Sequence, residues 1–170
     1  ERCAKIEVFT GDGRLQMARQ GPANYYHAIF IEAFNSDAIP THLITKEALQ
    51  MYLEKLAPGG VICIHISNRH VDLEPIIANT ARSLNLVART GNDRTQWQDP
   101  AYFISTWIVL TRDRADLLHL CEPEGIQEMN AQANQPWLRI QDNVSYWRTP
   151  VPDNGVIWTD DYTDLVAALR

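Results

Sequence analysis

The sequence lacks several features that would place it at once in a class of protein. No apolar run approaches the ~18 residues of a membrane-spanning helix, and we expect no signal peptide. The three cysteines form no Cys-x-x-Cys pair and the histidines show no His-x-x-x-His spacing, so we expect reduced thiols, a cytoplasmic location and no metal site. The 15 Lys and Arg against 21 Asp and Glu leave a net charge of −6, which disfavours nucleic acid and suits a cationic or neutral ligand.

The 170 residues, 45% of them apolar, suffice for one domain with a buried core, which we place at 1–170. Strand and helix signals alternate, which predicts an α/β fold with a mostly parallel sheet and flanking helices. Strands are expected at 6–10, 27–34, 61–66 and 103–111, with Cys63 as a core residue. Helices are expected at 14–20, at 73–86 after the N-cap Asp72, at 115–121, and at 162–170 after Thr159 or Asp160. A further helix is expected to begin after the N-cap Thr45 and to stop at Pro58-Gly59-Gly60. Residues 122–154 are expected to be mostly loop.

Carboxylates follow two of the predicted strands. The first strand is followed by Gly11-Asp12-Gly13, and the second by Glu32 and then Asp37. In an open parallel sheet, ligands bind beyond the carboxyl ends of the strands. A rim carrying these acids would attract amines, or would hydrogen-bond ribose hydroxyls and adenine amino groups.

Each acid also has a structural interpretation. Asp12 and Asp37 are both acceptable turn residues, and Asp12 could cap the next helix. Glu32 is harder to explain structurally, because a carboxylate directly after an apolar run is costly unless it is partnered or solvated by a site. His65, inside a strand, is typical of a hydrogen-bonded core histidine. The 160–162 segment could start a helix or belong to a site.

Five short blocks stand in a specific order and spacing. They are GDGRL at 11–15, EAFNSDAIPTHL at 32–43, LAPGGV at 56–61, HISNR at 65–69 and WTDDY at 158–162. Together they resemble the spermidine synthase-like family, the polyamine aminopropyltransferases. The closer match is to a bacterial branch whose members are often attached to membrane-spanning segments. This resemblance implies that the chain is the cytoplasmic part of a protein that could carry such a segment upstream.

The resemblance implies a Rossmann-like fold of the S-adenosylmethionine-dependent methyltransferase type. It also implies aminopropyl transfer from decarboxylated S-adenosylmethionine to a polyamine acceptor. By analogy, Glu32 holds the attacking amine and takes its proton, and Asp12, with Gly11 and Gly13, contacts the adenosyl group. Further acceptor-binding residues implied by the family are Asp37, Asp160, Asp161 and Tyr162.

The sequence departs from the family in two ways. Glu32 stands where true synthases carry Asp, and an extra methylene moves a carboxylate by roughly 1 Å, enough to lower a rate on the order of 10²-fold. The glycine-rich cofactor loop and the strand after it are missing, so the fold is expected to be N-terminally incomplete, with natural residues before Glu1 or a dimer formed through the gap. The alternatives are a methyltransferase that uses ordinary S-adenosylmethionine, and a non-catalytic interaction module.

Overall fold

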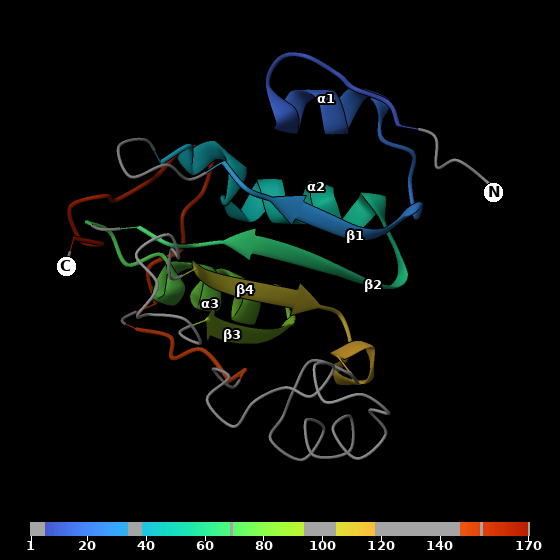
Figure 1. Ribbon diagram of the computed structural model, residues 1–170. Helices are drawn as coiled ribbons and strands as arrows, with labels where there is room; N and C mark the ends of the chain where they lie inside the picture. Colours follow the sequence, from blue (N-terminus) through green and yellow to red (C-terminus); the bar gives the residue numbers. More distant parts are fainter. Residues whose placement is uncertain are drawn as a thin grey trace.

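The structure, a computed structural model, describes residues 6–33, 39–68, 70–93, 105–117, 147–153 and 155–169. The described chain forms a layered α/β domain (Figure 1). Its elements are α1 (Gly13–Gln20), β1 (Tyr26–Ile31), the 3₁₀ turn η1 (Thr41–Leu43), α2 (Lys46–Lys55), β2 (Leu56–His65), α3 (Glu74–Ser83), β3 (Val87–Asp93), β4 (Ser105–Thr111) and the 3₁₀ turn η2 (Arg114–Leu117).

The four strands form one mixed sheet in the order β1-β2-β4-β3. β1 pairs in parallel with β2, whereas β4 is antiparallel to both β2 and β3. β1, β2 and β3 therefore run in one direction and β4 in the other. The expectation of a mostly parallel sheet holds for strand direction but is wrong for pairing, because two of the three ladders are antiparallel. The α/β class and the Rossmann-like arrangement of βαβ units with flanking helices are confirmed.

One face of the sheet carries the main core. Alternate residues of the strands point to this face, among them Ile29, Ile62 and Leu110, and they pack with Leu49 of α2 and Ile77 of α3. Both helices therefore cover the same side, as Figure 1 shows. A smaller cluster of Cys63, Val109 and Leu117 lies on the opposite face, so Cys63 is a core residue as expected.

The helix expected after Thr45 is confirmed together with its N-cap. The Thr45 hydroxyl accepts a hydrogen bond from the backbone N–H of Ala48 at 3.2 Å, which satisfies one of the free donors of the first turn. The helix ends at Lys55, three residues before the expected stop, because Pro58-Gly59-Gly60 already belongs to β2.

The third helix differs from expectation at both ends. It begins at Glu74 after Leu73, whose side chain makes no capping bond, although the Asp72 carboxylate accepts a 3.3 Å hydrogen bond from the Glu74 N–H. It ends at Ser83 because Asn85 adopts a left-handed backbone with φ of 55°, and the apolar residues beyond belong to β3, a strand that we did not predict.

Two expected elements are wrong. Residues 6–10 form no strand, and Ile6 and Val8 are 85% and 82% exposed, because β1 ends the described sheet and no described strand pairs with them. Residues 162–169 form turns instead of a helix. They are held by backbone pairing, since Val71 bridges Leu169 and the Ala168 carbonyl accepts from the Asp72 N–H at 2.8 Å.

The other expectations are partly covered by the described residues. The strands expected at 27–34, 61–66 and 103–111 are confirmed as β1, β2 and β4. Where a helix was expected at 115–121, the structure has a 3₁₀ turn at Arg114–Leu117, and residues 118–121 lie outside the described residues. Most of the loop expected at 122–154 also lies outside them. No helix in the described segments is both long and apolar enough to cross a membrane.

Candidate functional site

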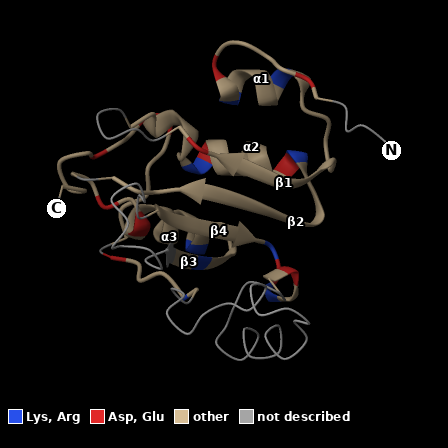
Figure 2. Cartoon of the chain, viewed as in Figure 1, with Lys and Arg blue, Asp and Glu red and all other residues tan. Residues whose placement is uncertain are grey.

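The carboxyl ends of β1 and β2 lie at the same edge of the sheet, because the two strands are parallel. Glu32 follows β1 directly. Both strands point toward the side of the domain on which the turn η1 and the C-terminal end of the protein lie (Figure 1). Acidic residues recur along this side in Figure 2.

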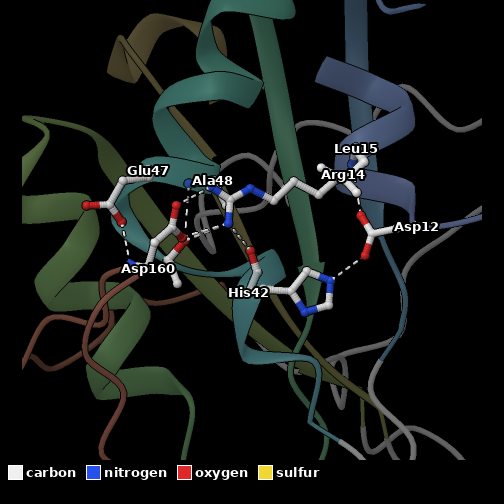
Figure 3. A network of polar contacts seen from close by, with 8 residues as sticks. Asp12, Arg14, Leu15, His42, Glu47, Ala48 and Asp160 are labelled. Atoms are coloured by element: carbon white, nitrogen blue, oxygen red, sulfur yellow. Dashed lines mark hydrogen bonds and ion pairs between the residues drawn. The ribbon is translucent and has the colours of Figure 1, made fainter. Parts of the chain in front are cut away.

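Asp12 lies at the start of α1 and holds two partners. Its carboxylate accepts a hydrogen bond from the Leu15 N–H at 2.8 Å, so it is the N-cap of the helix. The His42 ring donates to the other carboxylate oxygen from Nε2 at 2.9 Å (Figure 3). The bond from Leu15 is the main reason that the pKa of Asp12 is lowered, and His42 lowers it further. Gly11, with φ of 117°, provides the tight turn before Asp12.

Arg14 connects three separate parts of the chain. Its guanidinium makes two parallel 2.7 Å hydrogen bonds to the carboxylate of Asp160, a bidentate ion pair. It also donates to the backbone carbonyl of His42 at 2.8 Å (Figure 3). α1, η1 and the segment around Asp160 are thereby joined through one side chain.

Asp160 is also held by the start of α2. The Thr45 hydroxyl donates to the Asp160 carboxylate at 2.7 Å, and the backbone N–H of Asp160 donates to the Glu47 carboxylate at 3.0 Å. Arg14, and then Thr45, lower the pKa of Asp160. Asp160 therefore does not cap a C-terminal helix, as one interpretation of the sequence had it. Its carboxylate instead anchors the segment of residues 159–162.

The remaining predicted site residues are less constrained. Glu32 and Asp161 are exposed. Tyr162 is also exposed and donates from its hydroxyl to Asp164 at 3.3 Å, and the charge of Asp164 raises the pKa of that hydroxyl. Asp37 lies outside the described residues. The structure thus brings Asp12 and Asp160 together through Arg14 and His42, and shows no hydrogen bond between the Glu32 carboxylate and another described residue.

Sequence reasoning missed Arg14 and His42. Arg14 had one usable signal. A cation in the first turn of a helix faces the positive end of the helix dipole, which is unfavourable unless an anion lies beside it. Its position therefore favours an acidic partner, but the sequence could not show that the partner is Asp160.

A separate cavity of about 460 Å³ lies on the face of the sheet opposite α2 and α3. The Trp107 ring lies in its wall, with Phe30 edge-on at 6.3 Å between ring centroids and His65 tilted against it at 5.0 Å. His65 shares a 2.8 Å hydrogen bond with Ser67, as expected, but it is half-buried and not the core histidine that the sequence predicted. Burial raises the pKa of the Cys63 thiol in this wall to about 11. None of the predicted site residues lines this cavity. Its lining residues are Phe30, Val61, Cys63, Trp107, Val109, Asp116, Leu117 and Trp147.

The chain is similar to two known proteins. Over 56 residues, or 32% of this chain, it is 39% identical to a polyamine aminopropyltransferase of Vibrio vulnificus strain CMCP6. That stretch spans 19% of the relative. A crystal structure of MnmC2 from Aquifex aeolicus aligns over 79% of this chain and 42% of its own, with a TM-score of 0.41 and 13% identity. The chain therefore spans less than half of either protein. No family model matches it.

Proposed function

We propose that this chain carries the amine side and part of the adenosyl side of an aminopropyltransferase site. The enzyme would move an aminopropyl group from decarboxylated S-adenosylmethionine to a polyamine acceptor. The observation that carries the proposal is the set of acids around the carboxyl ends of β1 and β2, with Asp12 fixed in place and Glu32 exposed at the strand end. The partial similarity to a polyamine aminopropyltransferase supports it.

The chemistry needs little from the protein beyond placement. The acceptor nitrogen attacks the methylene carbon bonded to the sulfonium, a C–N bond forms, the C–S bond breaks, and methylthioadenosine leaves with the electron pair. Glu32 holds the attacking amine and takes the proton that the new C–N bond releases. Alignment of nitrogen, carbon and sulfur supplies most of the rate.

Different residues serve the two substrates. Asp12 accepts a hydrogen bond from the adenine amino group, with Gly11 and Gly13 allowing close approach of the backbone. Asp37, Asp161 and Tyr162 bind the charged acceptor chain. Asp160 contributes to the acceptor side by holding this segment, because its carboxylate already accepts three hydrogen bonds from Arg14 and Thr45, whereas the Asp12 carboxylate accepts two.

The test is a product assay with both donors. The protein is incubated with putrescine and either decarboxylated or ordinary S-adenosylmethionine, and products are identified by mass spectrometry. We expect an aminopropylated amine, formed on the order of 10²-fold more slowly by Glu32→Gln. Glu54→Gln, an exposed site in α2, is the matched control and keeps the rate. A methylated product would instead identify a methyltransferase, and an unchanged rate in Glu32→Gln would remove Glu32 from the mechanism.

A non-catalytic interaction module is the second candidate. It is favoured by apolar side chains that the described structure leaves in water, including Ile6 and Val8 before α1 and Phe30 of β1. This candidate predicts self-association or binding of a hydrophobic dye. A strict monomer in light scattering with no dye binding would count against it.

A further inference from the structure

Arg14 lies in a helix that is held mainly by polar contacts. No residue of α1 is buried, and Met17 is its partly buried contact with the main core. Polar bonds near its first turn therefore join α1 to the rest of the chain. Arg14 makes such bonds to His42 and Asp160, and the separate bond from the His42 ring to Asp12 holds the Gly11-Asp12-Gly13 loop without Arg14.

The partner of Arg14 belongs to the acceptor side of the proposed site. Thr159 and Tyr162 close a tight turn through mutual backbone hydrogen bonds of 2.8 and 3.2 Å. Asp160 lies within this turn and is fixed by its side chain and its N–H, whereas Asp161 and Tyr162 remain exposed. The anchored residue thus determines where its two exposed neighbours lie.

We propose that Arg14 is a positioning residue that couples the two halves of the site. Its ion pair with Asp160 holds the 159–162 turn, and with it Asp161 and Tyr162. The turn is thereby fixed relative to Asp12, which lies two residues before Arg14 in the chain. This inference rests on the proposed function for its catalytic meaning. The hydrogen bonds that join Arg14 and Thr45 to Asp160, here called the clasp, can be tested independently of the proposed function.

A lysine cannot replace Arg14 fully. Its ammonium is a point charge and cannot make two parallel bonds to one carboxylate. Asp160→Asn removes the charge of the other partner. If the two residues act as one unit, removing either one should have the same effect as removing both.

The first experiment measures hydrogen exchange in the full chain, read by mass spectrometry over residues 155–169. In Arg14→Gln we expect exchange about tenfold faster there, because the two hydrogen bonds from Arg14 to the half-exposed Asp160 carboxylate are lost. Asp160→Asn and the double variant should match it, Arg14→Lys should lie between, and Arg19→Gln at the other end of α1 should match the parent. Unchanged exchange in β2 shows that the sheet is intact. Exchange in Arg14→Gln equal to the parent, or effects that add in the double variant, would overturn the clasp.

The second experiment separates positioning from a merely structural role. In Arg14→Gln the KM for putrescine should rise about tenfold, while the binding constant for methylthioadenosine measured by calorimetry stays within about twofold. Arg14→Lys should recover part of the KM. A lower kcat with unchanged putrescine KM would refute the positioning role. If the parent protein forms no aminopropylated product, the proposed function fails, and the exchange result still decides whether the clasp exists.

Discussion

Replacing Thr45 with valine tests how the start of α2 and the 159–162 segment stabilise each other. Thr45 is 1% exposed, and its hydroxyl makes two main hydrogen bonds: it accepts from the Ala48 N–H and donates to the Asp160 carboxylate. A longer bond of 3.4 Å from Arg14 adds little to these. Valine keeps the shape of the side chain and removes only the hydroxyl. The change therefore reports on these two hydrogen bonds rather than on a cavity.

The expected magnitude follows from the two contacts. Loss of an N-cap hydroxyl costs about 1 kcal/mol. Loss of a hydrogen bond to a carboxylate costs about 1.5–3 kcal/mol when that group is shielded, but Asp160 is 43% exposed and water can replace the donor, so about 1 kcal/mol is expected. Together, Thr45→Val should lower the free energy of unfolding by about 2 kcal/mol, or lower Tm by roughly 4–8 °C.

Urea unfolding is the suitable assay for Thr45→Val. The midpoint should fall while the slope m stays constant, because the surface exposed on unfolding does not change. Thr45→Ser keeps the hydroxyl and loses one buried methyl, so it should cost about 1 kcal/mol or less. If valine costs less than about 0.5 kcal/mol, or less than serine, the hydroxyl contacts do not stabilise the fold and the reasoning is wrong.

Two further predictions concern glycine packing and acid stability. A Cβ at Gly60 would lie 2.8 Å from a side-chain carbon of Leu56, so Gly60→Ala should cost about 1–3 kcal/mol in urea unfolding, whereas Gly13→Ala meets nothing within 4 Å and should stabilise by about 0.4–1 kcal/mol. Equal effects at both positions would contradict the packing. The pKa of Asp160 is lowered mainly by Arg14, so its contribution to stability is complete above the unfolded pKa of about 3.9 and is lost as the pH falls through the lower folded value. Arg14→Gln should therefore lose less stability than the parent between pH 6 and pH 3, and parallel pH curves for the two proteins would refute this.

The elements that the sequence predicted correctly are those whose signals are local. α2 has an apolar stripe and a capping threonine, and both act within one helix. β2 and β4 are rich in apolar and β-branched residues, which are buried in the sheet. The role of Asp12 as a helix cap was also accessible, because a cap is a contact between near neighbours.

The errors occurred where distant contacts decide the structure. Residues 6–10 have strand composition, but a strand needs a partner and none of the described strands pairs with them. The apolar spacing at 165–169 suits a helix, yet backbone pairing with Val71 and Asp72 holds that stretch in turns. The ion pair of Arg14 and Asp160 spans most of the chain, so no local pattern could identify its two members.

Binding of the donor at Asp12 tests the proposed site most directly. Calorimetry with methylthioadenosine should detect binding to the parent protein, and Asp12→Asn should weaken that binding by about 10–100-fold, because one hydrogen bond to a charged group is lost. Asparagine is also a good N-cap, so α1 is kept. Asp113→Asn, which changes the aspartate at the start of η2, is the matched control and should bind like the parent. No binding to the parent, or equal affinity in Asp12→Asn, would contradict an adenosyl site at the carboxyl ends of β1 and β2.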